Sequence, residues 1–450
     1  MSAWTVDQVV ALAPDASSAS AGQGLASIKK WSAIGKSERA IWGLCQGSGK
    51  EPYQSRIDIS EPAFKCSCPS RKFPCKHGLG LFLLFVKDES AFKTLAEPGW
   101  VSEWIAGRAE RAEKKVERAK AVAEKPVDEA AQAKRAAERE ARVKEGVAGC
   151  RMWLEDVMRR GLAAARTEPS TLWDRMAARM VDAQAPGLAG MVRRIPELIA
   201  SGPGWDVRVL DHLGKLHLLL RASERLDTLP PDLAEDARIA MGWQRSKDEV
   251  LSFAGVQDRW AVLGQIVEEE ERLKVRRTWL VGRQSKRRAL VLDFAAGLAP
   301  LEQSVAAGSE FDSELAFYPG RLPLRALVKS RGESLRLSDD LGDAADQTIE
   351  AALHRYAQAL AANPWTVRWP MVLSQVRPAQ NEGRWHLVDR EASALPLQPS
   401  FASGLAWWRL VATGGGREIT VLAEWDGRWA MPLSVLVDGH FYDLATRWAS

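Results

Sequence analysis

Residues 65–77 of the chain read KCSCPSRKFPCKH and place four residues that commonly bind zinc within a short stretch. The candidate ligands are Cys66, Cys68, Cys75 and His77, in the order Cys-x-Cys, a gap, and Cys-x-His. Three thiolates and one imidazole form a closed tetrahedral set for structural Zn²⁺, with no position left for water or substrate. Soft sulfur ligands also favour zinc over calcium or magnesium. The stretch therefore predicts one structural Zn²⁺.

Apolar segments on both sides of this stretch predict the elements that would carry the ligands. Residues 41–45 and 55–59 are strand-like, and residues 78–86, GLGLFLLFV, are an apolar run of helical length. Pro69, Ser70 and Pro74 favour a turn between the two ligand pairs. The expected unit is a small ββα zinc module with the metal where strand and helix join.

The ligand order, with strands before it and an apolar helix after it, resembles the SWIM zinc finger. The resemblance covers roughly residues 40–86, and all four ligands match. That module is known in bacterial proteins, in chromatin-remodelling ATPases and in Mutator-type transposases. The rest of the chain is similar, more loosely, to long bacterial SWIM-type zinc finger proteins whose C-terminal regions have no settled activity. The resemblance implies zinc binding, with contact to DNA or to protein as the usual role of the module.

The three clustered cysteines could instead form a disulfide and a spare thiol. A chain of 450 residues with five cysteines is not a disulfide scaffold, and an intracellular setting favours metal over cystine. Cys45 and Cys150 lie outside the ligand spacing and are expected to be small buried residues.

Composition limits the remaining choices. The length suggests about three domains, and 62 basic against 58 acidic residues are too balanced to indicate nucleic acid on their own. Residues 1–25 lack a basic leader, so no signal peptide is expected. The longest apolar run, residues 79–86, is far shorter than a bilayer requires. These features predict a soluble cytoplasmic protein with no membrane partner.

The chain as a whole is expected to be a multidomain α+β protein. It would combine the small ββα zinc module, a helical middle region and a β-rich C-terminal region with one inserted amphipathic helix. Residues 14–24, rich in Ser, Ala and Gly, are expected to be a flexible lead-in. The predicted divisions are residues 1–105 for the SWIM-type zinc-finger domain (core 40–86), 106–146 for a charged helical linker, 147–245 for the helical region and 246–450 for the α+β region.

Periodicity places the expected elements of the last two regions. In the helical region, apolar stripes would bury Leu154, Val157, Met158, Leu172, Met176, Met180, Leu210, Leu213, Leu216 and Leu220. Strands are expected at residues 260–267, 275–281, 289–294, 315–318, 324–328, 367–373, 385–388, 407–411 and 419–425. The inserted helix would turn Ile349, Leu353, Tyr356 and Leu360 inward. Residues 381–383 and 426–427 predict hairpin turns, and residues 414–416 predict a hairpin loop.

Two basic clusters are candidates for contact with nucleic acid or another partner. Lys65, Arg71, Lys72 and Lys76 surround the ligands, although part of their charge would neutralise a Zn(Cys)₃(His) centre of formal charge −1. The second cluster comprises Lys274, Arg276, Arg277, Arg283, Lys286, Arg287 and Arg288 on a predicted hairpin. Such a hairpin could follow a phosphate backbone. Equally, it could pair with the acidic run at residues 268–271 on a neighbouring strand.

Enzyme signatures are missing from the sequence. It contains no phosphate loop, no H-E-x-x-H, no G-x-S-x-G elbow and no deaminase motif, although carboxylates could still serve in catalysis. The sequence therefore favours a zinc-binding protein without its own catalysis, whose zinc module is a platform for DNA or for a protein, with no small-molecule substrate identified. The alternatives are an adaptor for an ATPase or another complex with no nucleic-acid contact, and an enzyme with an unrecognised site in the C-terminal half.

Overall fold

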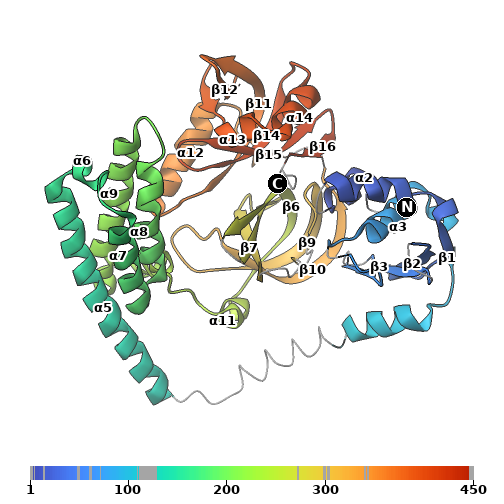
Figure 1. Cartoon of the computed structure of the whole chain (residues 1–450), viewed down its shortest axis with the longest axis horizontal. Helices are drawn as coiled ribbons and strands as arrows, with labels where there is room; N and C mark the ends of the chain where they lie inside the picture. The colour runs from blue at the N-terminus through green and yellow to red at the C-terminus, as the bar shows by residue number, and fades with distance from the viewer. Residues whose placement is uncertain are drawn as a thin grey trace.

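Figure 1 shows the computed structural model, in which four units follow one another along the chain. A zinc module lies at one side, a helical bundle at the other, and two β units lie between and above them. The structure describes all residues except 1–3, 5, 14–15, 48–50, 60–62, 71, 109, 111–128, 271–272, 297–300, 302–304, 339–340, 342–343 and 445–450.

The zinc module is built on a five-stranded sheet rather than on two strands. The strand order is β4-β3-β2-β1-β5, with β1 Trp31–Lys36, β2 Ala40–Cys45, β3 Tyr53–Asp58, β4 Ala63–Cys66 and β5 Lys93–Thr94. Helix α3 (Lys76–Lys87) packs on one face of this sheet and buries Leu79, Leu81 and Phe82. On the other face, Trp42 packs against Val101 from the helical residues 99–108. The ββα prediction therefore found the central elements and missed the rest of the sheet.

The expected flexible lead-in at residues 14–24 is wrong. Most of it forms helix α2 (Ala16–Leu25), which, like α1 (Val6–Ala11), packs against α3. Small residues allow this approach, because a Cβ added to Gly22 would lie 2.8 Å from Leu79 Cβ, and one added to Gly80 would lie 2.6 Å from Leu25 Cβ. The low-complexity composition thus serves close helix packing.

The middle region is a helical bundle with one apolar core. Its helices are α5 Glu129–Arg160, α6 Leu162–Ala165, α7 Ser170–Asp182, α8 Pro186–Ile199, α9 Trp205–Ser223 and α10 Pro231–Met241, followed by the short α11 Lys247–Ser252. Helix α5 runs without a break across residue 146, where the linker was expected to end. Most predicted apolar positions are buried, but Met158 and Leu210 are exposed, contrary to expectation.

The first β unit, here called the barrel, is a five-stranded sheet in the order β10-β9-β6-β7-β8. Its strands are β6 Val256–Glu270, β7 Leu273–Gly282, β8 Arg288–Ala296, β9 Ser309–Phe317 and β10 Ala326–Arg336. All hydrogen-bonded neighbours in this order are antiparallel. A parallel bridge between Leu290 and Arg325 brings β8 back to the start of β10, so the sheet curls toward closure.

The second β unit, the C-terminal sheet, has six strands in the order β13-β12-β11-β14-β15-β16. Its elements are α12 Ile349–Ala362, β11 Trp369–Asn381, β12 Arg384–Val388, β13 Ala394–Pro396, α13 Pro399–Ala402, α14 Leu405–Gly414, β14 Ile419–Trp425, β15 Ala430–Val437 and β16 His440–Asp443. The inserted helix was predicted correctly, except that Leu353 is exposed rather than inward. None of the described helices is long and apolar enough to cross a membrane.

The strand predicted at residues 407–411 is wrong, because this segment lies within α14. Trp407 and Leu410 are buried while Trp408 is 65 % exposed, which is the spacing of a helix face and not the alternation of a strand. Gly415 adopts φ +55° and ends α14 as its C-cap. The predicted hairpin loop at residues 414–416 is therefore the end of a helix.

The barrel and the C-terminal sheet share a buried interface. Leu263 and Trp279 of the barrel pack with Val372, Leu422 and Leu433 of the C-terminal sheet. Ser434 Oγ also donates a buried hydrogen bond to the carbonyl of Leu263. These two β units therefore form one packed body.

Candidate metal centre and its basic surroundings

The four predicted ligands come together at the junction of β4 and α3. Cys66 ends β4, Cys68 follows in the next turn, Cys75 is the N-cap of α3 and His77 lies in its first turn. Their ligand atoms all lie within 4.8 Å of one another, and Cys66 Sγ is 3.9 Å from His77 Nδ1. Sulfurs at the usual Zn–S distance would lie about 3.8 Å apart around a tetrahedral ion. The donor set therefore fits one structural Zn²⁺.

Neighbouring groups hold these ligands in place. The backbone N–H of Gly78 donates to Cys75 Sγ at 3.4 Å, so the N-terminus of α3 supports a thiolate at this position. The imidazole of His77 is buried and lies against the ring of Tyr53, with centroids 5.0 Å apart. Ser67 extends the pairing of β3 and β4, because it exchanges hydrogen bonds with the backbone of Gln54. Ligand placement thus depends on β3 as well as on the ligand loop.

The thiols differ in their readiness to ionise. A hydrogen bond from Cys66 lowers the pKa of Cys75 to about 4 and raises the pKa of Cys66 itself. Burial raises the pKa of Cys68. Zinc must displace the protons of those thiols that are still protonated, so metal binding releases protons and strengthens as pH rises.

This centre defines a zinc-finger protein in which the metal ties a strand to a helix. Residues 64–85 match the SWIM zinc finger family, and residues 138–241 match the SWIM-associated four-helix bundle domain. The chain therefore carries a SWIM zinc finger together with the helical bundle that accompanies it, and it binds one structural Zn²⁺ through Cys66, Cys68, Cys75 and His77. No curated protein and no solved structure matched the chain.

The remaining cysteines behave as expected. Cys45 and Cys150 are buried free thiols, and Cys45 packs in the core of the zinc module. Burial raises the pKa of the Cys150 thiol to about 12. Neither belongs to the described metal-binding group.

A groove of about 450 Å³ lies beside the metal centre, between α2 and the ligand loop. We call it the zinc-side groove. Its described lining residues are Ser17, Ser18, Ala21, Gly47, Tyr53, Cys68, Pro69, Ser70, Lys72, Lys76 and His77. Two of the predicted contact residues, Lys72 and Lys76, are exposed here, and Lys65 is exposed on β4. Arg71 lies outside the described residues.

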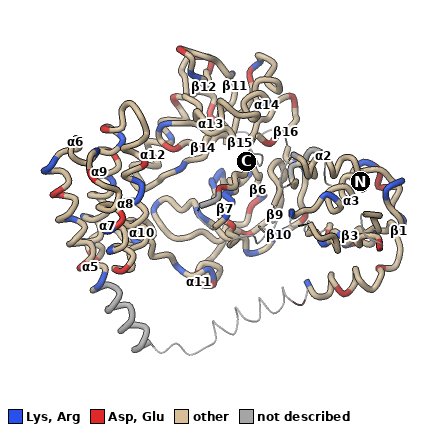
Figure 2. The backbone as a smooth tube through the Cα atoms, in the orientation of Figure 1, with Lys and Arg blue, Asp and Glu red and all other residues tan. Residues whose placement is uncertain are grey.

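Most arginines of the second basic cluster contact carboxylates. Arg276 pairs with Asp293 at 2.8 Å, Arg283 with Glu310 at 2.7 Å and Arg288 with Asp346 at 3.7 Å. Arg277 pairs with Glu268, which belongs to the acidic run considered above. Figure 2 shows acidic and basic residues interspersed along the chain. The cluster therefore carries far less net positive charge than its sequence suggests. At the β7–β8 turn, its members outside these described pairs are Lys286 and Arg287.

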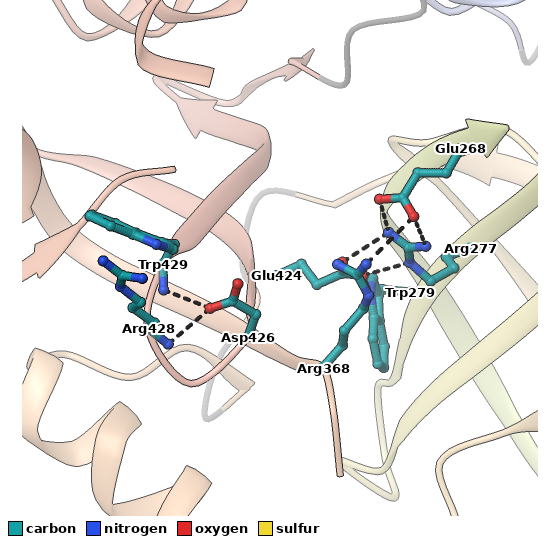
Figure 3. Close-up of polar contacts among 8 residues, drawn as sticks. All are labelled: Glu268, Arg277, Trp279, Arg368, Glu424, Asp426, Arg428 and Trp429. Carbon is teal, nitrogen blue, oxygen red and sulfur yellow. Dashed lines mark hydrogen bonds and ion pairs between the residues drawn. The ribbon is translucent and has the colours of Figure 1, made fainter. Parts of the chain in front are cut away.

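Sequence reasoning missed a buried polar network between the two β units, drawn in Figure 3. The Glu424 carboxylate, 2 % exposed, accepts hydrogen bonds from the Arg277 guanidinium at 3.0 Å and from the Trp279 indole at 2.8 Å. It also accepts one from Arg368 at 2.8 Å. Residues 277 and 424 lie on different sheets, so no local pattern could have joined them. Sequence reasoning also missed that Tyr53 and Ser17 line the zinc-side groove, because both are distant along the chain from the ligand loop.

Proposed function

We propose that this protein is a non-catalytic, zinc-dependent DNA-binding protein whose zinc-side groove receives the phosphate backbone. One observation carries the proposal: among the described residues that line this groove, none is acidic, whereas two are lysines. The described lining therefore offers cationic and hydroxyl groups to an anion.

The chemistry of the lining suits phosphate. Hydroxyl groups of Ser and Tyr, together with Lys side chains, are frequent ligands of phosphate oxygens. Lys72 Nζ lies 3.0 Å from Ser17 Oγ of α2, so a cation of the ligand loop and a hydroxyl of α2 meet at the same place. Zinc would contribute indirectly, because it fixes the loop that carries Lys72 to the start of α3, where Lys76 lies.

Duplex DNA binding by the whole chain tests this proposal. Replacing Lys72 and Lys76 together with Gln should weaken binding on all sequences alike and make the salt dependence of log K shallower by about 1.8, since each phosphate contact contributes about 0.9. Lys87→Gln is the matched control, because Lys87 is exposed at the opposite end of α3. Zinc content should stay at one per chain in every variant. An unchanged salt slope in the double variant with full zinc content would reject the DNA proposal.

A protein adaptor is the second candidate, and α14 is the observation in its favour. Leu405 and Trp408 are 72 % and 65 % exposed on this helix, and large exposed apolar residues commonly mark contact with another protein. Binding through α14 would depend weakly on salt and would be lost in Trp408→Ser. The two candidates are therefore separated by the salt dependence of binding and by which variant abolishes it.

We also propose that the protein acts in the cytoplasm. None of the five cysteines is paired in a disulfide, and three of them are the zinc ligands. Free thiols persist in reducing compartments, whereas an oxidising compartment favours disulfides. Labelling with a thiol reagent in intact and lysed cells would test the assignment, since a secreted protein would be labelled from outside.

A further inference from the structure

The barrel has the strand connectivity of an oligonucleotide-binding fold. Its first three strands, β6, β7 and β8, form a meander, and the fourth strand, β9, returns beside the first. The fifth strand, β10, pairs with β9 and meets β8 through a parallel bridge. The order around the barrel is therefore first, second, third, fifth, fourth and back to first. This is the five-stranded Greek-key barrel of OB folds, which bind oligonucleotides on their second and third strands and through adjacent loops.

Part of the face that OB folds use for ligands is closed in this protein. Arg277 and Trp279 point outward from β7, and both donate to the buried Glu424 of the C-terminal sheet (Figure 3). Both side chains are buried, and Trp279 packs with the apolar residues of the interface. The β7 part of that face is therefore closed to a ligand, and the end where the β7–β8 turn meets the β9–β10 loop offers another surface.

This end carries two arginines stacked on aromatic rings. The Arg287 guanidinium lies 3.9 Å from the ring centroid of Phe317, and that of Arg325 lies 4.3 Å from the centroid of Tyr318. Among the described residues, no carboxylate lies within ion-pair distance of either guanidinium. Burial lowers the pKa of both arginines, as expected for cations that are partly desolvated and not neutralised. Lys286 is exposed in the same turn.

A groove of about 430 Å³ runs beside these rings, with Phe317, Tyr318, Pro319 and Pro323 on its barrel side. Two carboxylates, Asp232 and Glu235, lie on its bundle side. Arg321 pairs with Asp232 at 3.0 Å, and Arg245 pairs with Glu235 at 2.7 Å. Both carboxylates that line the groove therefore have an arginine partner.

We propose that this end of the barrel binds single-stranded nucleic acid. Phosphates would pair with Lys286, Arg287 and Arg325, and unstacked bases would lie on the flat guanidinium groups that the aromatic rings support. Guanidinium planes and aromatic rings stack on exposed bases, which single strands offer and duplexes do not. The OB connectivity adds support by analogy, while the stacked, unneutralised arginines carry the assignment. This proposal for single-stranded nucleic acid does not depend on the duplex contact proposed for the zinc-side groove.

Anisotropy of a labelled oligothymidine of about 15 nucleotides, a length within the site sizes of OB folds, measures this binding on the whole chain. The variant Arg287→Gln with Arg325→Gln should bind at least tenfold more weakly, with a salt slope shallower by about 1.4, since each contact to a single strand contributes about 0.7. Arg259→Gln is the matched control, because Arg259 is an exposed arginine of the same barrel that is already paired with Asp312. The control should bind as the unmodified chain does.

Two further measurements make the outcome decisive. Circular dichroism would show whether the double variant folds. Lys286→Glu provides a second test if it does not, because Lys286 lies in an exposed turn. This variant should bind oligothymidine several-fold more weakly. The zinc-side variant of Lys72 and Lys76 should lose duplex binding and retain oligothymidine binding. If Lys286→Glu and a folded Arg287/Arg325 variant both bind oligothymidine as the unmodified chain does, or if the unmodified chain does not bind it, the inference is overturned, whatever the duplex result.

Discussion

The ligand loop of the zinc module and the interface of the two β units are stabilised by different interactions. The loop between Cys66 and Cys75 contains little apolar burial, and its one large apolar side chain, Phe73, is 40 % exposed. The β-unit interface buries Trp279, Leu422 and Leu433 and encloses the Glu424 network. The loop therefore depends on a metal ion for its conformation, whereas the interface depends on close packing and on the pairing of the buried Glu424 carboxylate. Loss of the metal should be a local event, and loss of one buried partner should affect the whole β body.

Removing a zinc ligand is expected to have the largest effect. Cys68→Ala should abolish zinc binding and unfold the ligand loop and its junction with α3, because structural zinc in finger peptides contributes about 10–16 kcal/mol of apparent binding free energy. Zinc analysis and limited proteolysis within residues 60–80 measure this loss. Cys45→Ala, a buried cysteine of the same module that is not a ligand, should keep full zinc content. Full zinc content in Cys68→Ala would refute the ligand assignment.

The same comparison predicts that the rest of the chain needs no metal. From residue 151 onward there is no cysteine, and the described metal-binding group lies wholly within residues 66–77. A fragment from about residue 129, where α5 begins, to the end should therefore be soluble, folded and metal-free by circular dichroism and elemental analysis. Melting of this fragment on addition of a chelator would show a second metal-dependent region and would reopen the enzyme alternative.

Breaking the Glu424 network should produce the next largest effect. Glu424→Ala leaves the buried Arg277 without one of its two carboxylate partners, and losing one partner of a buried pair costs about 3–5 kcal/mol. Urea unfolding followed by tryptophan fluorescence, to which the adjacent Trp279 contributes, measures the free energy of unfolding. Glu418→Ala removes an exposed partner of Arg390 and should change stability little. Equal effects of the two variants would mean that the β units are not held by this network.

The pH dependence of stability should show the contribution of Asp236 at the join of bundle and barrel. This residue is 5 % exposed, accepts a hydrogen bond from the Arg321 backbone N–H at 2.8 Å, and burial raises its pKa to about 6. Because the folded protein holds the proton more tightly than the unfolded chain, the associated stability is fully present below about pH 4 and is lost as pH rises through 6. The full loss is at most about 3 kcal/mol.

Asp236→Asn isolates this contribution. The unfolding free energy of the variant should decline less between pH 4 and pH 6 than that of the unmodified chain. Glu268 acts in the opposite direction, because the hydrogen bond from Arg277 lowers its pKa and its contribution is lost as pH falls. Only the difference between variant and unmodified chain is therefore informative. Identical pH profiles would show that Asp236 is not protonated in the folded protein.

The sequence predicted best those features that depend on neighbouring residues. Ligand spacing located all four donors, and a run of β-branched, aromatic and Leu residues located β14 at residues 419–425 with its ends correct. It could not predict the Glu424 network or the connectivity of the barrel, because both join residues that are distant along the chain. It also misassigned α14, since a run of Trp, Leu and Val suits a strand as well as a helix. The net positive charge of the basic hairpin was overestimated from the sequence, because its acidic partners lie on other strands and in a loop.

Residues 16–25, before the zinc module, show most clearly what composition alone could not predict. They also give the smallest expected change in the free energy of unfolding. Gly and Ala in residues 16–25 suggested flexibility, yet they let α2 approach α3 closely. Gly80→Ala adds a Cβ that would lie 2.6 Å from Leu25 Cβ and 3.1 Å from the Gly22 carbonyl. The helices must separate, so we expect a loss of about 1–3 kcal/mol in the free energy of unfolding of the zinc module.

A glycine with open space around it provides the control for this last variant. Gly190 lies in α8 with no atom within 4 Å of an added Cβ, so Gly190→Ala should stabilise the bundle by up to about 1 kcal/mol through helix propensity alone. Thermal melts of both variants with zinc bound measure the two effects. Opposite signs are expected, because only Gly80 lies at a helix contact. If Gly80→Ala is also stabilising, α2 does not pack on α3 in solution, and the flexible lead-in expected from composition would be the better description.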